Sequence, residues 1–158
     1  MSNEITIRRA NIGDFKQVHG LIMQVHKLHV KERSDIYRDT DPLDFEEFKE
    51  ELSNSNNIYL VAELKNEIVG ICFSQIKETL NNRIMKNRKV LHIENICVNK
   101  TNQRNGIGKE LYNEIVKLAQ EQKIDNIELM VWGFNENAIK FYENLGMNIK
   151  NFRFEQKI

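Results

Sequence analysis

Apolar residues recur along this chain with two different periods, and each period predicts a type of secondary structure. Alternating or continuous apolar runs indicate strands, whereas apolar residues three and four positions apart indicate helices. Strands are expected at Glu4–Arg9, Ile58–Leu64, Ile68–Ile76, Val90–Val98, Ile127–Trp132 and Met147–Phe154. Helices are expected from Asn11 to about Val30, around Phe45–Leu52, and over Gly106–Gln122 and Asn135–Leu145.

The order of these elements predicts the fold class. Strands and helices do not alternate strictly, so we expect an α/β (α+β) protein with a mixed, mostly antiparallel, twisted sheet of six to seven strands and helices on both faces. Only Lys65-Asn66-Glu67 separates the second and third strands, which is typical of an antiparallel hairpin. The polar, basic stretch Thr79–Lys89 is expected to form a loose loop.

Length and composition favour one soluble domain spanning residues 1–158. Acidic and basic residues number 23 each, so overall charge gives no reason to expect nucleic acid or a membrane as partner. Cys72 and Cys97 lie in apolar runs without CxxC spacing and are expected to be buried thiols. The first ten residues lack the apolar segment of a signal peptide, and the apolar runs are too short to span a bilayer, so a cytoplasmic location is expected.

The stretch His92–Tyr112 has the arrangement of a phosphate-binding site. An apolar strand ends near Val98, a polar loop follows, and Gly106 and Gly108 open an amphipathic helix. The free N–H groups and the dipole of a helix N-terminus favour an anion, and glycine allows close approach. A Rossmann fingerprint would need its glycine turn directly after the strand, and a P-loop would need Gly-Lys-Ser/Thr, so both fit less well.

Two motifs in the second half make this pattern specific. Gln103-Arg104-Asn105-Gly106-Ile107-Gly108 resembles the (Gln/Arg)-x-x-Gly-x-(Gly/Ala) signature of the GCN5-related N-acetyltransferase (GNAT) family. Asn135–Met147, read as NENAIKFYENLGM, resembles the family's C-terminal pattern Asn-x-x-Ala-x-x-Phe-Tyr-x-x-x-Gly-Phe, with Met147 in place of phenylalanine. The resemblance covers about residues 90–154 closely, and the first half matches only in the order of its elements. It implies the acyl-CoA N-acyltransferase (GNAT) fold, acetyl-CoA as donor and no metal.

The resemblance also implies which residues hold the donor. The pyrophosphate would lie on the backbone amides of Arg104, Asn105, Gly106, Ile107, Gly108 and Lys109, with charge added by the Arg104 and Lys109 side chains. The pantetheine arm would pair with the backbone of Ile96, Cys97 and Val98, in a slot opened by divergence from the following strand. Asn135 would bind the cofactor or cap its helix.

Acetyl transfer to an amine needs a base, an oxyanion donor and an acid. The resemblance assigns the acid to Tyr142, which would protonate the leaving thiolate; the alternative is a packed aromatic side chain. Glu94 is the first choice as base, since a carboxylate among apolar strand residues should have a raised pKa, and His92 is the second. Strict alternation would place His92, Glu94, Ile96 and Val98 on one face of their strand. Glu94 could instead orient the substrate or form a salt bridge.

The acceptor is expected to contact the first half, with His26, His29, Asp35 and Tyr37 as candidate residues. Polyamines and other small amines, amino acids, aminoglycosides and peptide amines all meet the chemical requirement. A non-catalytic acyl-CoA sensor of the same fold is the alternative function. By analogy with the family, a homodimer is a further expectation, with Met147–Phe154 as the pairing edge.

Overall fold

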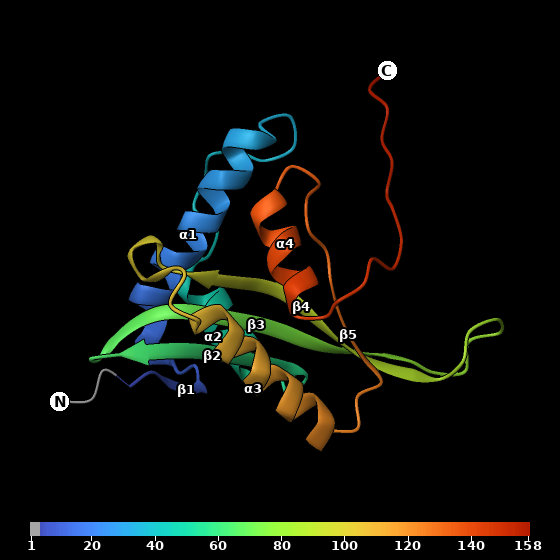
Figure 1. Cartoon of the computed structure of the whole chain (residues 1–158), viewed down its shortest axis with the longest axis horizontal. Coiled ribbons are helices and arrows are strands. Elements are labelled where there is room, and N and C mark those ends of the chain that lie inside the picture. The colour runs from blue at the N-terminus through green and yellow to red at the C-terminus, as the bar shows by residue number, and fades with distance from the viewer. Residues whose placement is uncertain (1–3) are drawn as a thin grey trace.

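A computed structural model describes residues 4–158, which form one five-stranded sheet with helices around it (Figure 1). The strands are β1 (Thr6–Arg9), β2 (Asn57–Leu64), β3 (Glu67–Thr79), β4 (Arg88–Val98) and β5 (Asn126–Leu129), in that order across the sheet. The helices are α1 (Phe15–Glu32), α2 (Phe45–Ser53), α3 (Ile107–Glu121) and α4 (Glu136–Asn144). Pairs β1–β2, β2–β3 and β3–β4 are antiparallel and β4–β5 is parallel, which confirms a mixed, mostly antiparallel sheet.

Two apolar cores sandwich this sheet. Alternate residues of β2 divide between them, because successive side chains of a strand point to opposite faces. One core joins the sheet to α3 through Ile107, Leu111 and Ile115. The other joins it to α1 and α2 through Val18, Leu21 and Phe48. The sheet therefore separates α3 from the α1–α2 pair. No helix within residues 4–158 is long and apolar enough to cross a membrane.

The expected number of strands, six to seven, is wrong, because residues 4–158 contain five. The missing strand is Met147–Phe154, which runs without regular secondary structure. Gly146, in the left-handed region at φ 88°, ends α4, and side-chain ion pairs from Lys150 to Glu128 and from Glu155 to Arg33 hold the segment. A strand-like pattern forms a strand only where a neighbour supplies a ladder of hydrogen bonds.

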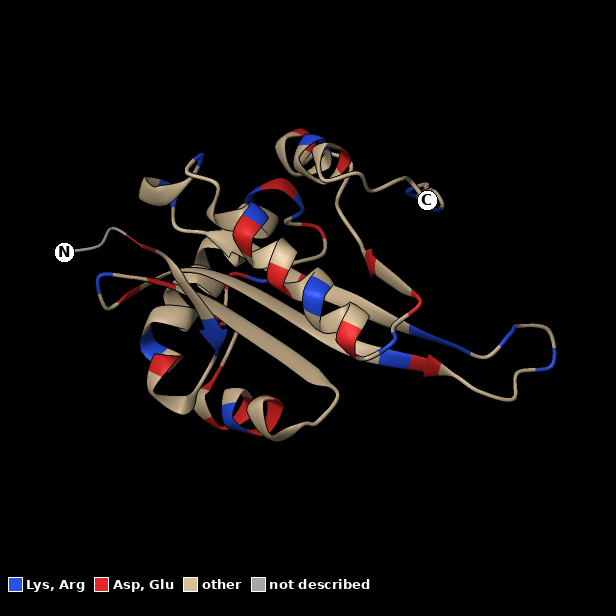
Figure 2. Cartoon of the chain, turned by 60° about the horizontal axis from the view of Figure 1, so that its bottom comes forward, with Lys and Arg blue, Asp and Glu red and all other residues tan. Residues whose placement is uncertain are grey.

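The stretch expected as a loose loop, Thr79–Lys89, is the end of a long hairpin. β3 continues to Thr79 and β4 begins at Arg88, with register pairs from Ile76–Leu91 to Thr79–Arg88. β2 accompanies β3 only as far as Gln75. The hairpin therefore projects from the body of the molecule, as Figures 1 and 2 show.

A β-bulge interrupts β4 at Glu94. Phe73 pairs with Asn95 and Ser74 with Ile93, so Glu94 is the extra residue opposite β3. Leu91 and Ile93 belong to the α3-side core, which Ile96 and Val98 also contact, while Cys97 belongs to the α1–α2 side. The prediction that His92, Glu94, Ile96 and Val98 share one face is therefore wrong, because the bulge reverses the alternation after Ile93.

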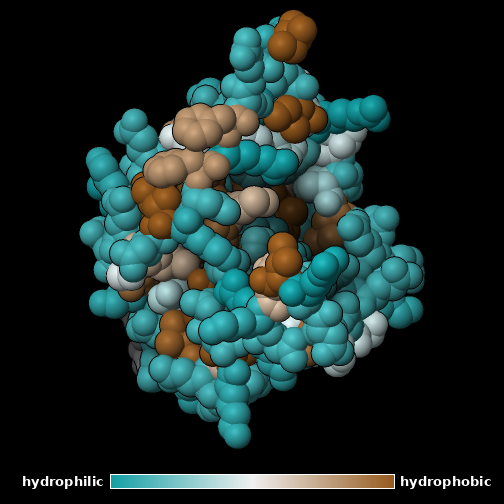
Figure 3. All heavy atoms as spheres, turned by 90° about the vertical axis from the view of Figure 1, so that its right-hand side faces the viewer, coloured by the Kyte–Doolittle hydropathy of each residue, from teal (hydrophilic) through white to brown (hydrophobic). Residues whose placement is uncertain are grey.

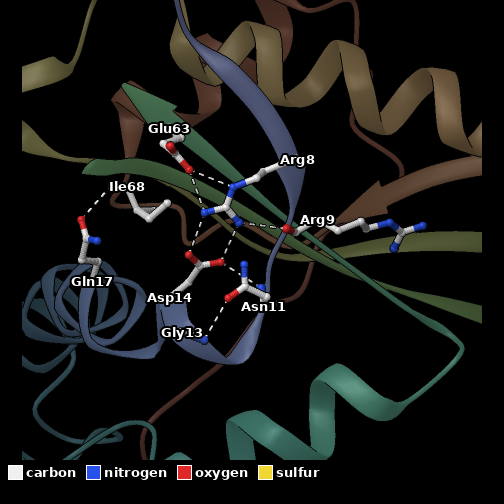
Figure 4. A network of polar contacts seen from close by, with 8 residues as sticks. All are labelled: Arg8, Arg9, Asn11, Gly13, Asp14, Gln17, Glu63 and Ile68. Atoms are coloured by element: carbon white, nitrogen blue, oxygen red, sulfur yellow. Dashed lines mark hydrogen bonds and ion pairs between the residues drawn. The ribbon is translucent and has the colours of Figure 1, made fainter. Parts of the chain in front are cut away.

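Arg8 ties the first strand to the rest of the fold (Figure 4). Its guanidinium donates to both carboxylate oxygens of Asp14 at 2.8 Å and to Glu63 on β2 at 2.8 Å. Asp14 is 6% exposed and also accepts from the backbone N–H of Asn11 at 2.8 Å. Burial raises the pKa of Asp14, but the bonds from Arg8 and Asn11 outweigh it and hold that pKa below its usual value.

Candidate functional site

The parallel strands β4 and β5 separate beside the bulge. Their paired residues run from Val90 with Asn126 to Ile93 with Leu129, and β4 then continues to Val98 with β3 alone. An opening of this kind leaves one backbone edge of β4 without a strand neighbour. It is the divergence that the family resemblance implied for this part of the chain.

The hydrogen-bond pattern of β4 decides which backbone groups face the opening. Asn99 N–H donates to Val69 O at 2.8 Å, and antiparallel bonding alternates along a strand, so the groups of Cys97 point toward β3. Those of Ile96 and Val98 point the other way. The Val98 carbonyl accepts from Gln24 Nε2 at 3.1 Å and from Gln103 Nε2 at 3.0 Å. The N–H and C=O of Ile96 and the N–H of Val98 are thus the groups aimed at the opening.

The loop after β4 leads to a helix start suited to an anion. Arg104 and Gly106 lie in the left-handed region, with φ of 64° and 80°, and α3 begins at Ile107. Ile107 itself is buried in the core, so only its backbone is available to a ligand. The first-turn amides of Ile107, Gly108 and Lys109 have no partner within the helix and face outward with the positive end of its dipole. Arg104, Asn105 and Lys109 are exposed.

Helix α4 lies against the start of α3. A Cβ added at Gly108 would come within 3.1 Å of Phe141 Cζ and 3.8 Å of Val98 Cγ2, so glycine allows α3, α4 and the end of β4 to meet. Tyr142 follows Phe141 and is half-buried. Burial above all raises the pKa of Tyr142 well above its usual value. The phenol stays protonated at neutral pH, the state that an acid requires.

Asn135 is the N-cap of α4, and its side-chain oxygen accepts from Ala138 N–H at 3.2 Å. The capping role is thus the one that the structure displays. The two cysteines are free and buried, as expected. Burial raises the pKa of Cys72 to about 12 and that of Cys97 to about 11, so neither is a thiolate nucleophile at neutral pH.

On the other face of the sheet the bulge brings Glu94 to a hollow of about 180 Å³. We call it the acidic hollow, because three carboxylate side chains, those of Glu47, Glu51 and Glu94, line it over an aromatic floor. Burial first, and then the charge of Glu51, raise the pKa of Glu94. The remaining lining residues are Ile22, Pro42, Leu43, Phe48, Tyr59, Phe73 and Asn95.

Tyr59 and Glu51 shape this hollow, and sequence reasoning did not single them out. Tyr59 Oη donates to Glu51 Oε2 at 3.0 Å, and the Tyr59 ring stacks on Phe73 at 4.0 Å between centroids. Glu51 lies on α2, where the amphipathic pattern showed only a polar helix face. Gln24 was missed too, since a glutamine on a helix gives no sign of its distant partner Val98. For Glu51, the only signal in the sequence was the presence of several glutamates on one helix and of Glu94 on a strand.

His92, the second candidate base, lies two residues before the bulge and pairs across the sheet with Gln75. Burial and then the charge of Lys77 lower its pKa, while Glu128 opposes them. His92 is not among the residues that line the acidic hollow, within the part of the chain that is described. Of the two candidate bases, Glu94 is the one that lines the hollow.

The four residues proposed to contact the acceptor form a separate cluster at the end of α1. His29 stacks on Tyr37 at 5.0 Å between centroids, and Tyr37 Oη accepts from Trp132 Nε1 at 3.1 Å. His26 Nε2 donates to the Arg38 carbonyl at 2.8 Å. Asp35 pairs with Arg33, whose guanidinium lies over Trp132 at 4.7 Å. This cluster fixes the segment after β5 against the α1–α2 loop.

Two regions of different chemistry therefore lie on opposite sides of the β4 bulge. The opening between β4 and β5 and the first turn of α3 offer backbone donors, and Tyr142 on α4 offers a neutral phenol. The acidic hollow offers carboxylates to a cation. Among residues 4–158, no three histidine, cysteine, aspartate or glutamate side chains are grouped to hold a metal ion.

Comparisons with known proteins identify the family and the fold. The model of the acetyltransferase (GNAT) family matches residues 22–147. An uncharacterized N-acetyltransferase in the pepI 3' region of Lactobacillus delbrueckii subsp. lactis is 26% identical over 120 residues, covering 70% of this chain and 68% of that protein. A tetramutant of the BH1408 protein from Bacillus halodurans has a TM-score of 0.93 at 32% identity, covering 97% of this chain and 99% of the other. The aminoglycoside N-acetyltransferase AAC(6')-Iy, solved with CoA, shares the fold, with a TM-score of 0.79 at 16% identity and coverage of 99% and 97%.

Proposed function

The chain belongs to the acetyltransferase (GNAT) family, and from this premise we propose that it transfers the acetyl group of acetyl-CoA to a primary amine. The observation that carries the proposal is the divergence of β4 from β5 after Ile93 and Leu129. It leaves the outward backbone groups of Ile96 and Val98 without a strand neighbour on that side, and the chain continues from there to the first turn of α3 at Ile107. A solved neighbour of the same fold contains CoA, which supports the same ligand here.

The residues present fit the donor in two places. The Ile96 and Val98 backbone groups that face the gap suit the amide groups of a pantetheine arm, which can pair with them as a strand would. The free amides of Ile107–Lys109 suit a pyrophosphate, and Arg104 and Lys109 add two positive charges nearby. Together these groups would fix the thioester near the bulge.

Three groups of the chain would then serve the reaction. Glu94 accepts the proton that the ammonium group must lose before its nitrogen attacks, directly or through a water molecule. The Ile96 N–H stabilises the oxyanion of the tetrahedral intermediate. Tyr142 donates its proton to the leaving thiolate, and its raised pKa keeps that proton in place until then. As the C–S bond breaks, the nitrogen loses its second proton to the Tyr142 phenolate, so the acetyl group ends on nitrogen and the thiol is released.

We further propose that the acceptor is a cationic amine. Glu47, Glu51 and Glu94 surround the acidic hollow, and an aromatic floor of Phe48, Tyr59 and Phe73 suits the alkyl part of such a molecule. Two neighbours of this fold are named as aminoglycoside acetyltransferases, and aminoglycosides carry several amino groups. Polyamines and aminoglycosides are therefore the first acceptors to test, ahead of amino acids and peptide amines.

The test measures release of the CoA thiol with acetyl-CoA and a panel of these four amine classes. We expect turnover with at least one polycationic amine, and we expect Glu94→Gln and Tyr142→Phe each to lower kcat by roughly 10²- to 10⁴-fold. Glu50→Gln is the matched control, because Glu50 is an exposed residue of α2 outside the acidic hollow. If the Glu94 and Tyr142 variants turned over like the control, the assigned roles would be wrong.

The second candidate function is an acyl-CoA sensor without catalysis. A sensor would show a raised melting temperature with acetyl-CoA but no thiol release with any amine of the panel. The half-buried, protonated Tyr142 beside the donor region favours the enzyme, because binding alone has no need of an acid at that position.

A further inference from the structure

The β3–β4 hairpin ends in an ordered arm, which we define as residues 77–89. The Asn82 side-chain oxygen accepts from the N–H groups of Ile84 and Met85, both at 2.9 Å. Asn87 accepts from Asn81 N–H at 2.8 Å. At the base of the arm, Lys89 N–H donates to Asp125 at 2.8 Å. The tip therefore has a definite shape of its own rather than the looseness that its composition suggested.

The tip of this arm is apolar and has no cover. Ile84 is 90% exposed, Leu80 61% and Met85 48%. Figures 1 and 2 show the arm projecting away from the helices. Figure 3, which views the end of the molecule on that side, shows apolar side chains standing out singly from a hydrophilic surface. Leu80, Ile84 and Met85 lie within six residues of one another on the same ordered tip, and apolar side chains gathered on a projection are typical of contact surfaces, unlike single ones scattered over a surface.

Charge divides unevenly between the arm and another part of the chain. The arm carries five basic residues against one carboxylate, and Figure 2 shows Lys and Arg along it. Residues 39–51, which include most of α2, carry seven carboxylates against one lysine. The net charge of zero therefore conceals two regions of strong and opposite charge.

Residues 39–51 also contribute to a second depression, which we call the apolar hollow. Phe15, Leu43 and Phe45 form its apolar part, and Asp41 and Asp44 lie at its rim with Lys16 and His19. Phe45 is 44% exposed, and its ring meets that of Phe15 edge-on at 5.3 Å. The hollow thus offers apolar surface beside two carboxylates and one lysine, with Asp41 paired to His19 at 2.7 Å, and the surplus of negative charge comes from the rest of residues 39–51.

We propose that the arm of one molecule docks in the apolar hollow of a second copy, with Ile84 and Met85 in the hollow and the arm's cations beside residues 39–51. The charge complementarity between these two regions of one sequence selects a second copy as the partner. Reciprocal docking of two arms produces a closed two-fold dimer. This inference does not depend on the proposed acetyl transfer.

Sedimentation velocity of the full chain over a wide range of concentration tests the dimer. We expect a monomer–dimer equilibrium that weakens as salt is added. Ile84→Ser should raise the dissociation constant about ten- to hundredfold, because an apolar side chain leaves the contact. The matched control is Ile158→Ser, at another fully exposed isoleucine outside both regions. Equal association of the two variants, or a monomer at every concentration of the wild-type chain, would overturn the proposal.

A charge exchange tests the partner's identity. Arg83→Glu with Lys86→Glu reverses the arm, and Glu46→Lys with Glu50→Lys reverses exposed positions of α2 that line neither hollow. Each pair alone should abolish association, and a chain carrying all four changes should regain it. Melting temperatures confirm that each variant is folded. The pairing is overturned if the fourfold variant fails to associate, or if species larger than a dimer form. It is also overturned if the chain stays monomeric and its arm binds anionic vesicles instead.

Discussion

At Glu94, burial and the neighbouring Glu51 carboxylate both oppose ionisation, and the contribution of Glu51 is testable through pH. The base must be deprotonated to act, so the acid limb of the kcat/KM profile should follow the raised pKa of Glu94. Glu51→Gln removes the second cause of that rise, so the limb should move to lower pH. Glu50→Gln, on the same helix but outside the acidic hollow, should leave the limb in place. An unchanged limb in Glu51→Gln would show that another group sets it.

Arg8 and Arg9 are neighbours with very different surroundings, which makes them a matched pair for stability (Figure 4). Arg8→Ala leaves the buried Asp14 carboxylate without its bidentate partner and should lower the free energy of unfolding by about 2–3 kcal/mol at neutral pH. Arg9, whose one side-chain bond is 3.4 Å long, should tolerate alanine with a change below about 0.5 kcal/mol.

The Arg8 effect should depend on pH in a definite direction. The folded pKa of Asp14 is held below its usual value, so its stabilising contribution is present above the ordinary carboxyl pKa and is lost as pH falls through the folded value. Without Arg8, burial instead raises that pKa, and protonation relieves the penalty. Denaturant unfolding at neutral and acid pH should therefore show the gap between the wild-type chain and Arg8→Ala narrowing in acid.

At the scale of elements, the distance between α3 and the sheet depends on Gly70 of β3. A Cβ there would lie 3.1 Å from Leu111 Cδ1, 3.2 Å from Ile107 Cγ2 and 3.3 Å from the Cys97 carbonyl. Gly70→Ala should destabilise the fold by about 1–3 kcal/mol, because two buried side chains and a backbone group must give way. Gly20, inside α1 with nothing within 4 Å of such a Cβ, should instead gain about 0.5–1 kcal/mol on change to alanine. Urea unfolding gives the free energy of unfolding of both variants. A rise in that free energy for Gly70→Ala as well as Gly20→Ala would contradict the close packing of α3 on Gly70.

Elements with a strong period were predictable, and their departures have local causes. The amphipathic stripes of α1 and α3 and the strand cores of β2, β3 and β4 lie where the pattern placed them. The helix expected around Phe45–Leu52 begins at Phe45, where Asp44 caps it by accepting from Glu47 N–H at 2.8 Å. The bulge at Glu94 cannot be recognised from the alternation of residues in the sequence, because it arises only when β4 pairs with β3. Met147–Phe154 has the composition of a strand but no ladder to join.

At the scale of the whole molecule, the candidate site divides between the two halves of the chain, and sequence reasoning reached them unequally. The donor side depends on short, local devices, a glycine-lined helix start and the Phe141-Tyr142 pair, so motifs could indicate it. The acceptor side depends on the meeting of α2 with β2 and β4, which brings Glu51 and Tyr59 to Glu94. Contacts between residues distant in sequence are set by packing, which no local pattern reports.

Because the donor side and the acceptor side use different residues, binding of acetyl-CoA can be measured without turnover. The donor region joins β4, α3 and α4, so a ligand bound there stabilises the folded chain by mass action. At a concentration one hundred times its dissociation constant, acetyl-CoA should add about 2.7 kcal/mol and raise the melting temperature by roughly 5–10 °C. Glu94→Gln and Tyr142→Phe should keep most of this shift while losing turnover, because their assigned roles are in proton transfer.

A pantetheine fragment without the pyrophosphate should give a smaller shift, since the first-turn amides of α3 then have no anion. If acetyl-CoA left the melting temperature unchanged, or if the fragment matched the whole molecule, the assignment of the α3 N-terminus to the pyrophosphate would be wrong.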